Sequence, residues 1–228
     1  MLFRSRFDAE RLAVEKGNVR EQLARRNDDA AEILQREWSW LLYGPAHPAA
    51  RQMTAAGLEA LGRDALVRFH RATYRPAHLI AAVAGDVEAA SVLASLARRL
   101  AAWKADGPEI PWPPAAPEPR AEPGLYRVEK EIPQGKVVIG QLGVRWERWD
   151  DPVRYALMVM NEILGGDFTS RITQRVRSDE GLAYSAGSSY DIGIFWPGSF
   201  TISYESKSAT VALAAKISLE EIARIRTE

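Results

Sequence analysis

Residues 177–185, which read RSDEGLAYS, predict the end of a helix and the start of a strand. Gly181 can adopt the left-handed conformation that ends many helices, and Ala183 would then open a strand. This geometry would bring the Arg177 guanidinium and the Tyr184 phenol to one rim, where both can donate hydrogen bonds to peptide carbonyls. From spacing alone, a surface arginine and a half-buried strand tyrosine are the more common explanation.

The residues around this stretch predict further helices and strands. Short β-branched and aromatic runs between turn signals indicate strands, and apolar positions three or four apart indicate helices. On these criteria we expect strands at 125–130 and 136–144, helices at 152–164 and 170–178, strands at 183–190 and 194–204, and a last helix at 209–226. This order predicts a mixed α+β fold with an antiparallel pair of strands late in the chain.

The first part of the chain also mixes helices with a strand. Apolar residues recur on one face from Leu12 to Leu41 and predict one long helix, which Gly44-Pro45 would stop. Beyond it we expect a helix at 64–74, a strand at 78–84 and a helix at 88–102.

Prolines are concentrated in the middle of the chain, where seven of the 13 lie between Pro108 and Pro123. Such a segment favours polyproline II, cannot continue a helix and acts as a semi-rigid spacer. We therefore expect a linker at 104–124 between a first domain at 1–103 and a second at 125–228. A proline-rich ligand for an aromatic groove is the functional alternative.

The composition limits the classes of function. The 228 residues contain 30 Lys+Arg and 30 Asp+Glu, so the chain lacks the positive charge that nucleic-acid binding usually exploits. Without cysteine, it cannot form disulfides or hold zinc through thiolates. No apolar run reaches the roughly 18 residues of a membrane span, and the charged start predicts no secretory signal.

The three histidines, His47, His70 and His78, do not form a metal motif. No two of them lie four apart, so no helix can present two imidazoles to one metal. Each is more simply explained as a structural residue. The chain also lacks the Gly-x-Ser-x-Gly motif of a serine nucleophile.

Several motifs together resemble one family of enzymes. In chain order they are Glu15 to Gln22, Tyr43-Gly44, His47-Pro48, Phe69-His70, Tyr74-Arg75-Pro76, Val83 to Val87, Asn161 to Gly166, Ser170-Arg171 and Arg177 to Ser185. These motifs resemble the pitrilysin/insulinase family of zinc metallopeptidases, the inverzincins, over nearly the whole chain. The second-half motifs are the more specific, because they combine glycines, Ser-Arg and the interval between arginine and tyrosine.

The resemblance implies a fold and a way of working. Family members consist of related α+β domains that face each other as two halves of a clamshell around an unfolded peptide. We therefore expect two partial metallopeptidase-like α/β-sandwich domains, with the C-terminal part of one at 1–103 and the N-terminal part of a second at 125–228. Zinc in the family is held by H-x-x-E-H and a distant glutamate. This sequence contains no H-x-x-E-H, so the resemblance implies that the segment carrying it would precede these residues.

The helix that would supply the third zinc ligand also departs from the family pattern. Glu15 occupies one family position, but the zinc-ligating glutamate seven residues later is replaced by Gln22. A neutral amide is a weak zinc ligand. Glu21 is rotated by about 100° around the helix and can replace it only after a register change. Glu15 and Gln22 are therefore interpreted as vestigial metal-helix positions, and we expect this chain to bind no zinc.

Arg177 and Tyr184 match residues that bind substrate in the family, on the half opposite the zinc. The resemblance thus implies a zinc-free portion that binds peptide or unfolded polypeptide and complements a catalytic, zinc-bearing peptidase subunit. Two alternatives remain: a structural or interaction subunit without proteolytic role, and a fragment of an active zinc protease whose H-x-x-E-H lies upstream. A homodimer is a further option, because sheet edges can pair between copies. The sequence leaves a periplasmic or a cytoplasmic location in a bacterium open.

Overall fold

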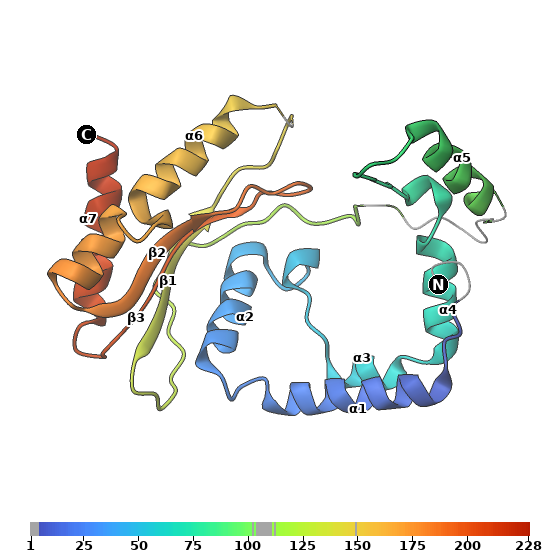
Figure 1. The fold of residues 1–228 in the computed structure, drawn as a ribbon. Helices are drawn as coiled ribbons and strands as arrows, with labels where there is room; N and C mark the ends of the chain where they lie inside the picture. Colours follow the sequence, from blue (N-terminus) through green and yellow to red (C-terminus); the bar gives the residue numbers. More distant parts are fainter. Residues whose placement is uncertain (1–4, 102, 104–110, 112, 149) are drawn as a thin grey trace. The chain divides into compact units, whose positions relative to one another are not determined.

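The computed structural model describes residues 5–101, 103, 111, 113–148 and 150–228 (Figure 1). Two compact units emerge. Unit 1 consists of Met1–Arg25 and Gln52–Ala115, and unit 2 of Arg26–Arg51 and Ala116–Glu228. The linker and domain boundaries expected from the prolines remain a prediction, and residues 104–110 and 112 of that linker lie outside the described residues.

Unit 1 is helical. Its helices are α1 (Ala9–Arg25), α3 (Ala55–Ala60), α4 (Arg63–Thr73) and α5 (Ala89–Leu100). Polar contacts join α1 to α3, because Lys16 Nζ donates to the carbonyls of Glu59 at 3.1 Å and Leu61 at 3.2 Å. The Arg20 guanidinium also lies 2.6 Å from the Glu59 carboxylate. Helices α1, α4 and α5 have no fully buried residue.

Two sequence predictions for the first part of the chain are wrong. The long helix is interrupted, because α1 ends at Arg25 and α2 (Ala30–Tyr43) begins only after Asp29, whose carboxylate accepts from the Ala31 amide at 2.7 Å. Aspartate and asparagine favour such caps over helix interiors. The strand expected at 78–84 does not form among the described residues. A strand needs a hydrogen-bonded neighbour, and Ile80 is instead 94% exposed.

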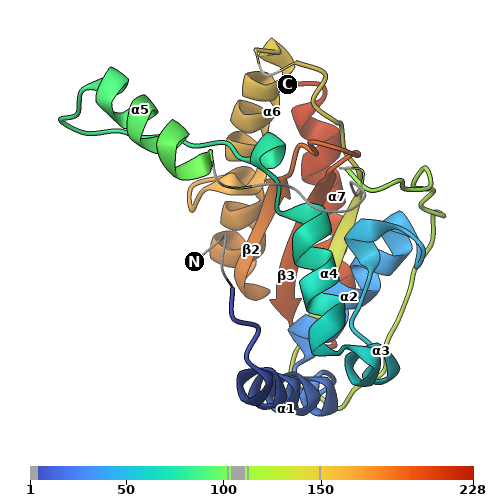
Figure 2. The same cartoon turned by 90° about the vertical axis from the view of Figure 1, so that its right-hand side faces the viewer.

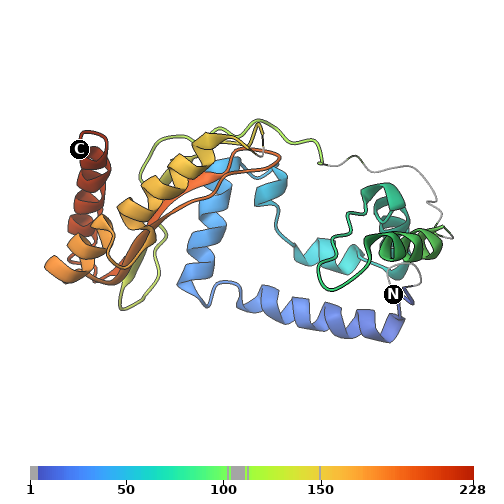
Figure 3. The same ribbon diagram turned by 45° about the horizontal axis from the view of Figure 1, so that its top comes forward.

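Unit 2 is built on a three-stranded antiparallel sheet with the order β1-β3-β2. The strands are β1 (Gly135–Leu142), β2 (Ala183–Tyr190) and β3 (Ser199–Ser206). Helices α6 (Pro152–Asn161) and α7 (Val211–Ile225) lie on one side of the sheet, and α2 lies on the other (Figure 1, Figure 2 and Figure 3). The α+β class and the late antiparallel pair are therefore confirmed.

The strand predictions in this unit are partly wrong. Residues 125–130 form no strand among the described residues, and Leu125 is 98% exposed. The strand expected from residue 194 begins only at Ser199. Its first residues belong to a tight loop, in which a side chain on Gly193 would collide with the Trp196 carbonyl.

The core of unit 2 lies between the sheet and the helices around α6 and α7. Its buried residues are Leu164, Ile172, Val176, Ala183, Ala186, Ile202, Tyr204, Ala214 and Ile217. Beyond α6 the chain continues as a π-helical turn, Glu162–Gly166, and a second π-helical segment spans Thr173–Asp179. Both pack against β2. Among the described residues, no helix is long and apolar enough to cross a membrane.

Candidate functional site

The π-helical segment Thr173–Asp179 ends at a left-handed glycine, as the sequence predicts. Gly181 has a φ of +60°, and the Leu182 amide donates to the Val176 carbonyl at 2.9 Å. The chain then enters β2 at Ala183. This tight turn brings the end of the helix and the start of the strand close together.

The turn places Arg177 beside two exposed aromatic rings. The guanidinium carbon of Arg177 lies 5.1 Å from the centre of the Tyr184 ring and 4.5 Å from the centre of the Phe168 ring. Both distances are typical of cation–π interactions. Tyr184 is 82% exposed and Phe168 is 58% exposed, so solvent reaches both rings. We call these three residues the Arg177 cluster.

The sequence predicts the approach of Arg177 and Tyr184 but misses Phe168. This phenylalanine follows the Gly165-Gly166 pair and precedes Ser170-Arg171, between two of the motifs that carry the family resemblance. Its position between these two motifs is the sequence feature that could have marked it as a site residue. Periodicity offered none, because Phe168 lies in the connection between the two π-helical segments.

Arg177 differs from the two neighbouring arginines in its ion pairing. Among the described residues no Asp or Glu oxygen lies within 4.0 Å of its guanidinium, although two nearby arginines are paired. Arg171 lies 2.9 Å from Glu228, and Arg175 lies 2.8 Å from the buried Glu221. The arginines of this stretch therefore divide into two that tie it to the C-terminal part of unit 2 and one that faces the aromatic rings.

The start of β2 departs from regular pairing beside the cluster. Ala183 pairs with Ser206 and Ala186 with Tyr204, so a bulge or irregularity separates the two pairs and includes Tyr184. Further along β2, side chains cover carbonyls at the strand edge: Thr173 Oγ1 donates to Ala186 at 2.8 Å and Asn161 Nδ2 to Ser188 at 3.3 Å. Tyr184 thus lies in the irregular stretch between these two pairs, with its side chain exposed.

The positions that the resemblance relates to zinc lie on α1 in unit 1. Glu15 pairs with Arg11 at 2.5 Å and accepts from Asn18 at 3.3 Å, and Gln22 is exposed. Within the described parts of the chain, no three His, Cys, Asp or Glu side chains come together in a way that could hold a metal. With a neutral amide at Gln22 and no histidine pair, these residues do not fit the family's zinc ion.

A second aromatic cluster surrounds the buried His47. Its ring stacks on Tyr43 at 4.9 Å and meets the edge of Trp196 at 4.9 Å, and the Tyr43 hydroxyl donates to the Pro197 carbonyl at 2.8 Å. Because Nδ1 accepts from the Ala49 amide at 3.1 Å, the neutral ring carries its proton on Nε2. Burial lowers the pKa of His47. This cluster joins α2 to the loop before β3.

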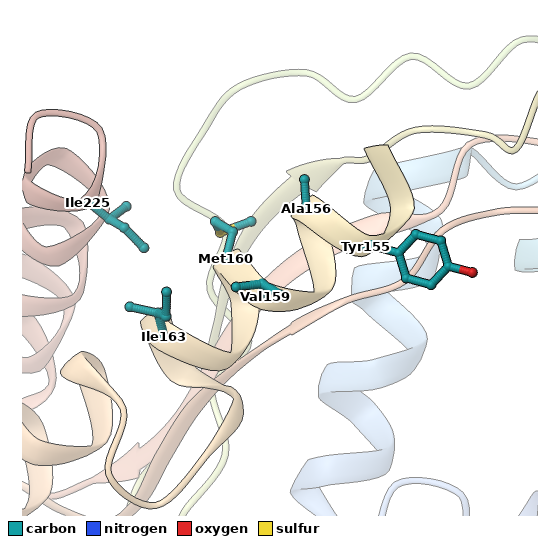
Figure 4. A pocket seen from close by; sticks show the side chains of 6 residues that line it. All are labelled: Tyr155, Ala156, Val159, Met160, Ile163 and Ile225. Carbon is teal, nitrogen blue, oxygen red and sulfur yellow. The ribbon is translucent and has the colours of Figure 1, made fainter. Parts of the chain in front are cut away.

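An apolar hollow of about 570 Å³ lies between α6 and α7. Figure 4 shows Met160 of α6 and Ile163 of the following π-helical turn on the side toward Ile225 of α7. The full lining consists of Tyr155, Ala156, Val159, Met160, Ile163 and Ile225. Apart from the tyrosine hydroxyl, the lining side chains carry no polar group, so the hollow offers little for catalysis or for orienting a polar ligand.

Comparison with known sequences identifies relatives over most of the chain. Residues 60–228 match the family profile described as "Peptidase M16 inactive domain". An uncharacterized zinc protease of Streptomyces coelicolor is 31% identical over 232 residues, which cover 97% of this chain and 49% of that protein. An uncharacterized zinc protease of Mycobacterium tuberculosis is 30% identical over 201 residues, covering 84% and 44%. The chain thus spans about half the length of the curated relatives it matches.

Solved structures show the same fold. A crystal structure described as a peptidase M16 inactive domain from Pseudomonas fluorescens superposes with a TM-score of 0.85 at 23% identity, over 98% of this chain and 53% of that one. A protease from Helicobacter pylori superposes with a TM-score of 0.77 at 18% identity, over 96% and 56%.

Proposed function

Since this chain belongs to the peptidase M16 family, we propose that it binds extended substrate peptide through Arg177 and Tyr184 and complements a catalytic, zinc-bearing half. The match to the family's inactive domain makes it a portion of an M16 peptidase that does not carry the catalytic motif. Peptide binding and partnership with a catalytic half are the functional steps that this proposal adds.

The observation that carries the proposal is a guanidinium beside two exposed aromatic rings. Arg177 lies over the rings of Phe168 and Tyr184, and no carboxylate pairs with it among the described residues. A peptide that passes along the start of β2 would meet guanidinium donors, a phenol hydroxyl and two ring faces. These groups recognise backbone carbonyls and side chains without demanding one sequence.

Zinc chemistry belongs to the other half in this proposal. When bound there, the metal would activate the attacking water. The residues of this chain would hold the peptide in place, and Tyr184 would donate a hydrogen bond toward a substrate carbonyl. The 228 residues should therefore bind no stoichiometric zinc, which metal analysis of the purified chain can test. Tight zinc binding would contradict this assignment.

The direct test is the affinity for an unstructured fluorescent peptide, measured by fluorescence anisotropy. We expect Arg177→Gln and Tyr184→Ala each to weaken binding by about 5- to 30-fold, the loss that corresponds to one or two hydrogen bonds or ring contacts. Arg154→Gln is a control for the ring contacts alone, because Arg154 also lies over two rings, those of Trp146 at 4.5 Å and Tyr155 at 5.8 Å, but belongs to α6 and not to the start of β2, where the peptide is proposed to pass. It should leave the affinity unchanged.

The same measurements separate the proposal from a purely structural subunit. A chain that binds no peptide, or binds it with equal affinity after both substitutions, would favour an interaction subunit with the family fold. Addition of a catalytic M16 partner to the full-length protein should restore proteolysis, and Tyr184→Phe should then lower the turnover number. An unchanged turnover number would remove the Tyr184 hydroxyl from the mechanism.

A further inference from the structure

Resting on the proposed peptide-binding function, we propose that the Arg177 cluster selects a carboxylate: either an acidic side chain or the C-terminal carboxylate of the bound peptide. Binding through backbone carbonyls alone would make the site indifferent to peptide charge. The surroundings of Arg177 instead favour an anionic partner, which assigns a specificity to the site.

Neighbouring arginines of this segment are paired unequally. Arg171 and Arg175 have their carboxylates within the fold, at 2.9 Å and 2.8 Å. Arg177, two residues after Arg175, has none among the described residues, although its side chain is partly buried. A partly desolvated guanidinium without an internal counter-charge attracts an anion more strongly than a fully hydrated one.

The position of Arg177 over the rings also favours a carboxylate. A guanidinium that lies over a ring face still has N–H groups that can donate to another partner. The described residues provide no hydrogen-bond acceptor for Arg177, whereas Arg175 donates to Glu221 at 2.8 Å. A carboxylate can accept two parallel hydrogen bonds from a guanidinium, and a carbonyl oxygen lacks the charge that strengthens them.

Three acidic residues near the cluster oppose this attraction. Asp179 and Glu180 follow Arg177 in the same turn and are exposed, but neither approaches its guanidinium within 4.0 Å. Asp167 is already engaged, because its carboxylate accepts from the Thr169 hydroxyl at 2.8 Å and the Thr169 amide at 3.3 Å, which lowers its pKa. Water and salt screen these exposed charges, whereas direct contact with Arg177 is screened less.

The test uses four fluorescent peptides with one unstructured neutral sequence. One pair carries Glu or Gln at a central position, both with amidated C-termini, and the second pair has a free or an amidated C-terminus without acidic side chains. Affinity for the full chain is measured by anisotropy at low and at physiological salt, with wild type, Arg177→Gln, Arg177→Lys and the control Arg154→Gln. We expect the peptide with the preferred carboxylate to bind about tenfold more tightly than its neutral counterpart, and we expect this ratio of affinities to decrease as the salt concentration rises.

The outcomes distinguish the two carboxylate sources, and they separate the carboxylate preference from peptide binding itself. A Glu-over-Gln preference that disappears in Arg177→Gln, and is reduced in Arg177→Lys, supports side-chain recognition. A preference for the free C-terminus with the same behaviour supports terminal recognition. Equal binding of all four peptides, weakened uniformly by Arg177→Gln, overturns the carboxylate preference and leaves peptide binding intact. Binding that is absent, or that does not change in Arg177→Gln, overturns both the carboxylate preference and peptide binding through Arg177. A carboxylate preference that persists in Arg177→Gln but disappears in Arg154→Gln would show that Arg154, and not Arg177, binds the carboxylate, and would overturn the proposal.

Discussion

A single methyl group on Gly165 should destabilise unit 2. Gly165 lies in the π-helical turn after α6 and packs directly on the backbone of β2. A Cβ at this position would contact the Ser188 amide nitrogen and lie 2.5 Å from its hydroxyl oxygen and 2.8 Å from its Cβ. The same serine is held by Asn161, which accepts from its hydroxyl at 2.8 Å. Gly165→Ala therefore has to displace strand backbone as well as a side chain.

The expected loss is about 2 kcal/mol. Overpacking of this kind costs about 1–3 kcal/mol, and a strained Asn161–Ser188 contact adds roughly 1 kcal/mol. The lower entropy of the unfolded alanine chain offsets about 0.4–1 kcal/mol. For a protein of this size, the result corresponds to a Tm lower by about 4–8 °C.

Urea unfolding followed by circular dichroism measures this change. The matched control is Gly17→Ala in the middle of α1, where an added Cβ meets nothing within 4 Å. That substitution should stabilise the protein by roughly 0.5–1 kcal/mol, because alanine is the better helix former. A Gly165→Ala protein as stable as wild type would refute the close packing of the turn on β2.

Three further predictions concern stability. Burial lowers the pKa of His47, so the unfolded chain takes up a proton at a higher pH than the folded chain does. The contribution of the neutral, buried His47 to the free energy of unfolding should be complete above about pH 6.5 and should fall as the pH drops below that value. The substitution His47→Gln should flatten this pH dependence in urea titrations at pH 8 and pH 5. Glu221→Gln should lower the free energy of unfolding by about 2 kcal/mol. This loss is smaller than for a fully buried ion pair, because the Arg175 and Arg224 side chains are 31% and 49% exposed and can be hydrated by water when their partner is lost. A loss above about 4 kcal/mol would contradict this expectation. Asp29→Ala removes the cap of α2 and should lower the unfolding free energy by about 1 kcal/mol in the same assay, whereas an unchanged midpoint would show that the cap contributes nothing.

Local signals in the sequence predicted local structure well. The left-handed glycine at Gly181, the bounds of β2 and the extents of α4, α5 and α7 follow from turn chemistry and periodicity. The approach of Arg177 to Tyr184 follows from the same turn, because it depends on only eight consecutive residues. Their role in substrate binding stays a prediction.

Features that depend on distant residues were not predictable in this way. Residues 78–84 and 125–130 have the composition of strands, but strand formation requires a partner that periodicity does not specify. The break between α1 and α2 was missed, because the prediction rested on the apolar stripe from Leu12 to Leu41, which continues across the Asp29 cap. Phe168 lies beside Arg177 because two π-helical segments pack on β2, and hydrophobic periodicity in the sequence does not predict such packing.

The assembly of α2 into unit 2 affects how the chain folds during synthesis. The Tyr43 hydroxyl bonds to the carbonyl of Pro197, 154 positions later. At roughly 5–20 residues per second, a ribosome needs about 8–30 s to deliver that partner after Tyr43 has been made. During this interval Ile33 and Leu42, which are buried in the folded unit, have no sheet to pack against. The nascent chain therefore carries these two apolar side chains for seconds before the strands that bury them have been made.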